Sequence, residues 1–133
     1  MTEPIEGGCL CGAVRYRADG PPRWIAHCHC RSCRRQTGSA FATYISVDRA
    51  RFAFATGEPV RFPSSEGVVR ASCGRCGTPL TYESVRWADE THILLGTLDQ
   101  PERFPPQAHA YVDEKLPWLR IDDGLPQSGS PSA

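Results

Sequence analysis

Residues 72–78 read SCGRCGT, and this stretch constrains the fold more than any other. Its cysteines, Cys73 and Cys76, have the C-x-x-C spacing that turns two sulfurs toward one ion. The glycines at 74 and 77 permit the tight backbone that such a turn needs. A C-x-x-C pair also occurs in redox proteins, but there it accompanies a thioredoxin-like βαβ pattern, which this sequence lacks. The stretch therefore predicts a zinc knuckle.

Two further groups of cysteines accompany the knuckle. Cys9 and Cys11 form a C-x-C pair, and in an extended strand residues two apart share a face, so both sulfurs can meet one metal. The third group lies in the stretch CHCRSC and holds three cysteines: Cys28, Cys30 and Cys33. Two pairs complete a closed four-sulfur zinc site, whereas three protein ligands with one open position are typical of catalytic zinc. The seven cysteines thus divide into four plus three, and spacing alone leaves open which groups share the closed site.

Composition narrows the class of protein. The 133 residues suit one domain, and 15 basic against 15 acidic side chains give a net charge of zero, which argues against a nucleic-acid partner. The N-terminal residues lack the basic and apolar regions of a secretory signal, and no segment has the ~20 apolar residues of a membrane helix. We therefore expect a cytoplasmic protein with reduced thiols and no membrane partner. An odd number of cysteines also disfavours a disulfide framework.

The rest of the sequence indicates a mainly β fold. Twelve glycines and twelve prolines exceed the roughly 12% of average usage and divide the chain into short pieces. Alternating or β-prone runs predict strands near residues 14–17, 41–45, 52–55, 60–62, 68–71, 80–82, 92–95 and 108–112. One short helix is expected over Ser32–Thr37, with Ser32 as N-cap and Gly38 as its C-terminal stop.

The chain is predicted to form one zinc-binding domain over residues 1–123, followed by a loose tail over residues 124–133 that is small and polar. Trp118 precedes this boundary, and a Trp near a chain end is expected to plug the core. The sequence leaves the oligomeric state open.

Histidines and arginines surround the three-cysteine group. If residues 27–30 are extended, His27 and His29 point away from the sulfurs of the neighbouring cysteines, which favours packing or supporting hydrogen bonds over ligation. Arg31, Arg34 and Arg35 could offset the charge of three thiolates. Arg34 and Arg35 are also candidates to hold the carboxylates of a peptide-like thiol, although a solvated helix face explains them equally well.

Four stretches of the sequence resemble those of a known family: GGCLCGAVRY, HCHCRSCRRQTGS, SCGRCGTPL and PWLRIDDGLP. Over residues 7–126 the sequence resembles the glutathione-dependent formaldehyde-activating enzyme family. The resemblance implies a β-tent fold, built from short antiparallel sheets with zinc knuckles and little helix. It also implies two zinc ions per chain: a structural ion on Cys9, Cys11, Cys73 and Cys76, and an exchangeable, catalytic ion on Cys28, Cys30 and Cys33.

The activity that the resemblance implies is carbon–sulfur lyase chemistry, which joins formaldehyde to glutathione and reverses that reaction. A thiol would enter the open metal position as thiolate, because metal binding favours deprotonation. Two alternatives come from other classes: a non-enzymatic zinc-binding module that contacts another protein, and a redox sensor built on the three-cysteine group. A closed four-ligand site is usual in zinc-ribbon modules, and three cysteines do not supply one.

Overall fold

A computed structural model describes residues 3–130. It contains ten strands: β1 (Ile5–Gly8), β2 (Arg15–Ala18), β3 (Trp24–Cys28), β4 (Ala42–Asp48), β5 (Phe52–Thr56), β6 (Val60–Ser65), β7 (Val68–Ser72), β8 (Pro79–Ser84), β9 (Glu90–Leu94) and β10 (Ala108–Ala110). One α-helix, α1 (Arg31–Thr37), is joined by five short 3-10 turns: η1 (Arg49–Arg51), η2 (Val85–Trp87), η3 (Leu95–Thr97), η4 (Pro101–Arg103) and η5 (Val112–Glu114). The mainly β prediction is confirmed.

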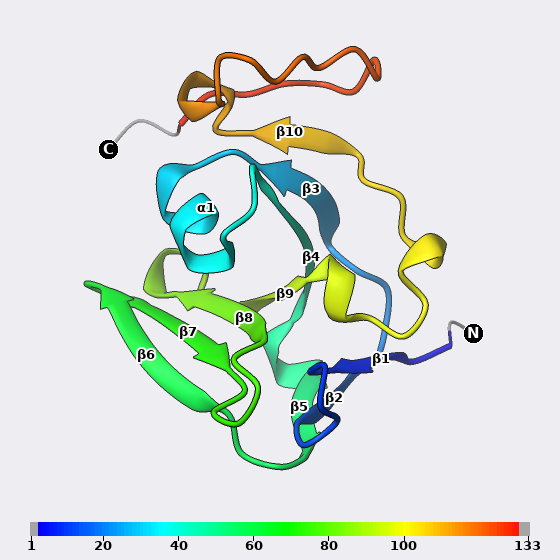
Figure 1. Ribbon diagram of the computed structural model, residues 1–133. Helices are drawn as coiled ribbons and strands as arrows, with labels where there is room; N and C mark the ends of the chain where they lie inside the picture. The colour runs from blue at the N-terminus through cyan, green and yellow to red at the C-terminus, as the bar shows by residue number, and fades with distance from the viewer. Residues whose placement is uncertain (1–2, 131–133) are drawn as a thin grey trace.

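The strands form two sheets (Figure 1). The smaller has the order β1-β2-β5, and the larger has the order β10-β3-β4-β9-β8-β7-β6. Every pairing is antiparallel except that of β10 with β3, which is parallel. In the larger sheet, α1 is the connection between the neighbouring strands β3 and β4.

The core joins the two sheets. Ile25, Ile45 and Ile93 are cross-strand neighbours on β3, β4 and β9, and all three are buried. They belong to one cluster with residues of the small sheet, including Ile5 and the fully buried Tyr16. Each such side chain stabilises the fold by roughly 1.5–3 kcal/mol through burial. The sheets are thus held in fixed relation, which matters because each supplies one half of a cysteine cluster.

Most predicted elements are present, with informative exceptions. Strands occur at all eight predicted places, while β1 and β3 were not among the predicted strands. The helix begins one residue earlier than predicted, and Ser32 as its N-cap is wrong. Cys30 occupies that position, where its Sγ accepts the Cys33 N–H at 3.3 Å. Gly38 is the predicted stop, in the left-handed conformation (φ 71°) that favours glycine.

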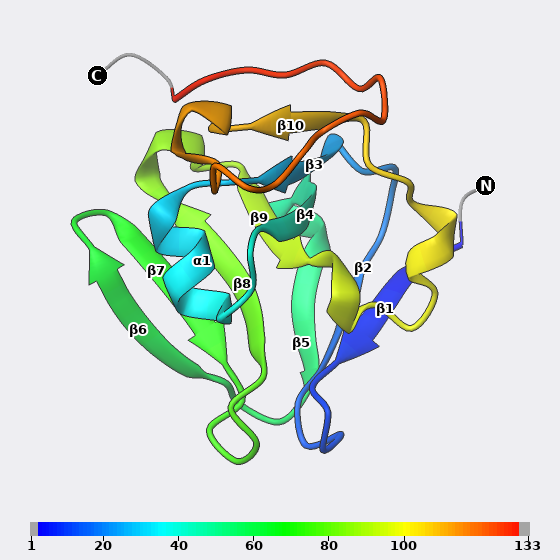
Figure 2. The ribbon, with the colours of Figure 1, turned by 45° about the horizontal axis from the view of Figure 1, so that its top comes forward.

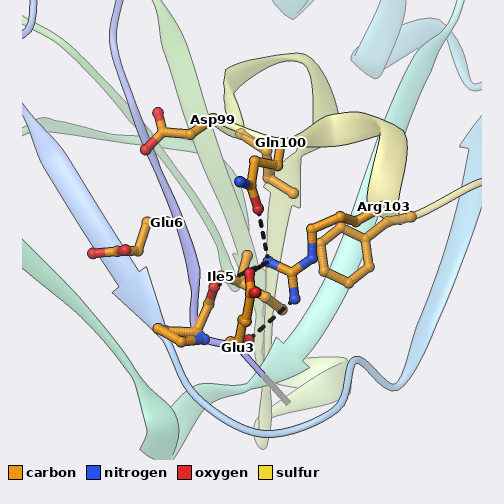
Figure 3. Close-up of a pocket in the computed structure, with 9 residues that line it drawn as sticks. Glu3, Ile5, Glu6, Asp99, Gln100 and Arg103 are labelled. Carbon is orange, nitrogen blue, oxygen red and sulfur yellow. Dashed lines mark hydrogen bonds and ion pairs between the residues drawn. The ribbon is translucent and has the colours of Figure 1, made fainter.

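Arg103 anchors the N-terminal end of the small sheet. Its guanidinium donates to the backbone carbonyls of Glu3 and Pro4, both at 3.2 Å, and to Oε1 of Gln100 at 3.3 Å (Figure 3). These groups line a cavity of about 230 Å³. Arg103 thus satisfies several hydrogen-bond acceptors that line this cavity. We therefore interpret the cavity as the place where the arginine holds residues 3 and 4 against the small sheet.

The C-terminal segment lies alongside strand β10 (Figure 2). His109 N–H donates to Pro126 O at 2.8 Å, and Ser128 N–H donates to His109 O at 2.9 Å. The described part of the expected loose tail is therefore held in place by backbone hydrogen bonds along the free edge of β10. Residues 131–133 lie outside the described residues, and the division at residue 123 stays a prediction. Within the described residues, no helix combines the length and apolarity required to cross a bilayer.

Candidate metal centres and their cavity

Four cysteines meet where two loops approach each other. Cys9 and Cys11 lie in the β1–β2 loop, and Cys73 and Cys76 lie in the β7–β8 loop, side by side at the bottom of Figure 2. Their sulfurs all lie within 4.8 Å of one another. The Sγ–Sγ distance is 3.6 Å between Cys9 and Cys11 and 3.8 Å between Cys11 and Cys73. Two distant pairs, one per sheet, thus form one cluster.

The local backbone aims these sulfurs. Cys73 Sγ accepts the N–H groups of Arg75 (3.3 Å) and Cys76 (3.4 Å), the pattern of a tight knuckle. Gly77 completes the turn with φ 82°, a conformation that L side chains rarely adopt. The Thr78 hydroxyl accepts Leu10 N–H from the opposite loop and lies 3.1 Å from Cys76 Sγ. This contact is the main reason that the pKa of Cys76 falls to about 5, which favours the thiolate that binds metals.

The donor set fits zinc. Four sulfurs about 2.3 Å from a central ion would stand about 3.8 Å apart at the corners of a tetrahedron. The two contacts of 3.6 and 3.8 Å are close to that edge length. Four sulfur donors are also the usual set of a closed structural zinc site.

The three-cysteine cluster lies around the start of α1. Cys28 ends β3, Cys30 caps the helix, and Cys33 is in the first turn, so strand end and helix start bring the sulfurs together. Cys30 and Cys33 Sγ are 2.9 Å apart, closer than the tetrahedral edge, so these two sulfurs must separate to hold one ion. Among the described residues no histidine or carboxylate joins this group. It therefore supplies three ligands and leaves a fourth position.

Tyr44 and Arg70 contact this cluster from the larger sheet. The Tyr44 hydroxyl donates to Cys33 Sγ at 3.4 Å, and Arg70 Nη1 donates to the Tyr44 oxygen at 3.4 Å. Burial raises the pKa of Tyr44, so its hydroxyl stays protonated and serves as a donor. Both side chains are at least 95% buried, which makes these contacts part of the fold.

The three cysteines open into a cavity of about 350 Å³. Its remaining wall includes six aromatic side chains and comes from segments spread along the chain: Trp24, Ala26, Ser32, Tyr44, Ser65, Val68, Arg70, Tyr82, Trp87, His92, Ala110, Tyr111 and Glu114. A mostly apolar pocket with a few converging polar groups is typical of a small-molecule site. The open side of the three-cysteine cluster therefore faces a space that can admit a substrate.

His27 and His29 lie outside the cluster, as the strand alternation predicts. His27 Nδ1 lies 2.7 Å from Thr43 Oγ1, and His29 Nε2 lies 2.9 Å from His109 Nδ1. His109 Nε2 in turn lies 2.7 Å from Asp123 Oδ2. His27, His109 and Asp123 also bring their donor atoms within 4.8 Å. The hydrogen bonds occupy both nitrogens of His109, so this group tethers the C-terminal segment to β3.

Comparison with known proteins identifies the family. The family model described as glutathione-dependent formaldehyde-activating enzyme matches residues 4–114, most of the chain. The chain belongs to this family. An uncharacterized lyase of Schizosaccharomyces pombe is 31% identical over 111 residues, which covers 83% of this chain and 80% of the relative. A Halomonas elongata protein named after the same family is 29% identical over 127 residues, which covers 89% of this chain and 81% of the relative.

The fold is also found among solved structures. A crystal structure of a Rhodobacter sphaeroides protein superposes with a TM-score of 0.61 at 19% identity, covering 71% of this chain and 87% of that chain. At this identity the likeness concerns the fold alone. For this family member, fold and family are therefore shown, together with two cysteine clusters able to hold metal.

The remaining residues singled out from the sequence are Arg34, Arg35 and Trp118. Neither Arg34 nor Arg35 is among the residues that line the cavity, so their contact with a substrate stays a prediction. Trp118 as a core plug is wrong, because 69% of its surface is exposed. Sequence reasoning missed Arg70, which lines the cavity. It lies 37 residues after Cys33, the nearest cysteine of the three-cysteine cluster, and outside the motifs that hold these cysteines.

Proposed function

We propose that the protein is a zinc-dependent carbon–sulfur lyase that acts on a thiol adduct such as S-hydroxymethylglutathione. The observation that carries this proposal is that the incomplete ligand set of Cys28, Cys30 and Cys33 opens into a cavity whose wall includes several aromatic side chains. Family membership and the lyase name of one relative support the same class of reaction. A non-enzymatic zinc module has no need for a cavity at an open ligand position.

In this proposal the four-cysteine cluster holds a structural zinc ion and the three-cysteine cluster an exchangeable one. Zinc bound at the second cluster would supply a Lewis acid that favours the thiolate form of an incoming thiol. In the forward reaction the sulfur lone pair forms the carbon–sulfur bond, the carbonyl π electrons move to oxygen, and that oxygen gains a proton. In reverse the hydroxyl loses its proton, the oxygen re-forms the carbonyl bond, and the carbon–sulfur bond breaks with its electron pair returning to sulfur.

The chain's own residues prepare the site for this chemistry. Tyr44 donates to Cys33 Sγ and holds that ligand in place. Trp24, Tyr82 and Trp87 supply large aromatic surfaces to the wall of the cavity in which a thiol would bind. Because the seven thiols form no disulfide, the proposal also keeps the cytoplasm as the expected location, which cell fractionation can test.

The test is direct detection of the adduct's exchange. Zinc-loaded protein should accelerate the interconversion of ¹³C-formaldehyde and S-hydroxymethylglutathione, followed by exchange NMR against the uncatalysed rate. Cys30→Ser should return the rate to the uncatalysed level, while Arg61→Gln, an exposed β6 substitution, should keep it. A parent protein with two zinc ions and no acceleration would contradict this reaction.

A further inference from the structure

We propose that Arg70 forms an anion subsite in the cavity, which selects thiols that carry a carboxylate close to their sulfur. The inference rests on the proposed function, since it assumes that a thiol binds at the open position of the three-cysteine cluster. It assigns to Arg70 the role that sequence reasoning gave to Arg34 and Arg35.

The first observation is the unusual placement of the guanidinium. Arg70 is 5% exposed, yet within the described residues it makes no ion pair with a carboxylate. Its Nε donates to Ser64 Oγ at 3.1 Å, and its Cζ lies 4.9 Å from the centre of the Tyr82 ring. A buried charge is costly unless it is paired, and apart from the Tyr44 hydroxyl the acidic group nearest to Arg70 is the Cys33 thiol, which a bound metal ion would share. The guanidinium can therefore take a further negative partner from the cavity.

The second observation is the distribution of charge around the cavity. Among the described lining residues Arg70 is the only lysine or arginine. Glu114 lines the same cavity, but its carboxylate already accepts Arg31 N–H at 2.9 Å and the Ser130 hydroxyl at 2.9 Å. An anion that enters the cavity therefore finds one basic side chain to bind.

The free edge of the guanidinium has the right form for a carboxylate. With Nε engaged by Ser64, the two terminal nitrogens remain, and Nη2 makes no hydrogen bond to any described residue. Two parallel N–H groups match the two oxygens of a carboxylate. Nη1 also contacts Tyr44 at 3.4 Å, a long bond that an anionic acceptor can replace.

The third observation is proximity to the cysteine cluster. Tyr44 bridges Cys33 Sγ and Arg70 Nη1 by two contacts of 3.4 Å each, so these two atoms are separated by at most twice 3.4 Å. A sulfur bound beside Cys33 and a carboxylate bound at Arg70 can therefore belong to one small molecule. The same guanidinium also offsets the negative charge of the thiolates, and the test must separate the two roles.

The experiment compares two thiols that differ only in charge. Calorimetric titration of zinc-loaded protein with 3-mercaptopropionate and with its uncharged amide, 3-mercaptopropionamide, needs no enzymatic turnover. The acid should bind about tenfold more tightly or better, the range of a charge-assisted hydrogen bond in a buried site. Equal affinity for the two thiols would overturn the anion subsite while leaving the thiol site intact, whereas failure of both to bind would overturn the proposed function as well.

Variants locate the subsite. Arg70→Gln should reverse the preference, because a carboxylate near three thiolates is then repelled while the amide is not. Arg70→Lys keeps the charge without the two-nitrogen fork and should give an intermediate ratio. Arg61→Gln removes an exposed cation from the neighbouring strand β6 and should leave the ratio of the parent.

Two outcomes would contradict the assignment. If Arg70→Gln weakens both thiols by the same factor, Arg70 only offsets the cluster's charge. If the Arg34→Gln/Arg35→Gln double variant abolishes the preference for the acid, the subsite lies on α1. Zinc content and circular dichroism of each variant establish that it is folded. Equal affinity of the parent protein for the two thiols overturns the subsite even if Arg70→Gln does not fold, and Arg70→Lys then locates it.

Discussion

Replacing Cys73 with serine should unfold the protein at moderate temperature, whereas replacing Cys30 should not. Cys73 is 2% exposed and belongs to the cluster that joins the β1–β2 loop to the β7–β8 loop. Apart from contacts of the sulfurs, the bond from Leu10 N–H to Thr78 Oγ1 is the only hydrogen bond between these loops among the described residues. Such a bond contributes only about 0.5–1.5 kcal/mol.

The expected loss is much larger than that bond. A structural zinc ion contributes on the order of 10 kcal/mol in small domains, and a domain's whole stability is about 5–15 kcal/mol. If serine at position 73 removes even half of the metal's contribution, about 5 kcal/mol is lost. At about 3 °C per kcal/mol for a chain of this length, Tm should fall by roughly 15 °C or more.

Cys30→Ser is the matched control. Cys30 caps α1 by accepting Cys33 N–H at 3.3 Å, and a serine oxygen is a good acceptor at that position. The variant should lose the second zinc ion, keep the first, and melt within a few degrees of the parent. A mild chelator should likewise remove the ion of the three-cysteine cluster first, without unfolding the protein.

Thermal denaturation, with zinc counted per chain by mass spectrometry, measures both variants. A soluble Cys73→Ser protein with the Tm of the parent would refute the structural role of the four-cysteine cluster. A Cys30→Ser protein that unfolds as readily as Cys73→Ser would show that both clusters are structural, and the open-site argument would fail.

Three further predictions concern the surroundings of the sites. Tyr44→Phe removes the donor to Cys33 Sγ and should release zinc from that cluster at several-fold lower chelator concentration, with an unchanged fold; equal release would contradict the contact's importance. Ile93→Ala opens a cavity in the shared core and should cost about 2–5 kcal/mol in denaturant titration, and a smaller loss would show that the sheets repack. Arg15 holds the pKa of Asp99 below its ordinary value of 3.8 through their hydrogen bonds, so this pair stabilises the fold above about pH 4 and the benefit is lost as the pH falls further. Asp99→Asn should therefore cost at most about 1 kcal/mol at pH 7, with a difference from the parent that shrinks in acid; a constant difference would contradict the linkage.

The cysteine clusters could be predicted from sequence because their geometry is mostly local. A C-x-x-C pair and a C-x-C pair each fix two sulfurs within a few residues, and the four-plus-three count limits how they combine. The extended strand expected for Cys9 and Cys11 is wrong, because both lie in the β1–β2 loop, with Cys11 in a turn. The parity argument for His27 and His29 succeeded for the same reason, since it depends only on strand alternation. What spacing could not supply was the pairing of Cys9 and Cys11 with a loop sixty residues away, which requires the sheet topology.

Arg70 shows why the rest of the site was not predictable. Along β7 the usual alternation would place valine inside and arginine outside, but Val69 is 37% exposed and Arg70 is 5% exposed. The inversion makes sense only once Ser64, Tyr44 and Tyr82 are seen around the guanidinium, and they come from three other strands. Similarly, Ser32 is the better N-cap by composition, but the chain uses Cys30 because the strand end already places that sulfur above the first turn.

Exposure and ligand count give opposite answers about which metal should exchange. Cys11 and Cys76 of the four-cysteine cluster are exposed, whereas all cysteines of the three-cysteine cluster are buried or half-buried. If access of water controlled release, the four-cysteine cluster would lose its ion first. Release, however, requires breaking metal–ligand bonds, and the three-cysteine cluster has one fewer protein ligand to break and a cavity through which a competing ligand can approach. The burial of its sulfurs then serves a different purpose: a low-dielectric wall strengthens the contacts of Tyr44 and Arg70 at the position where a thiol would enter.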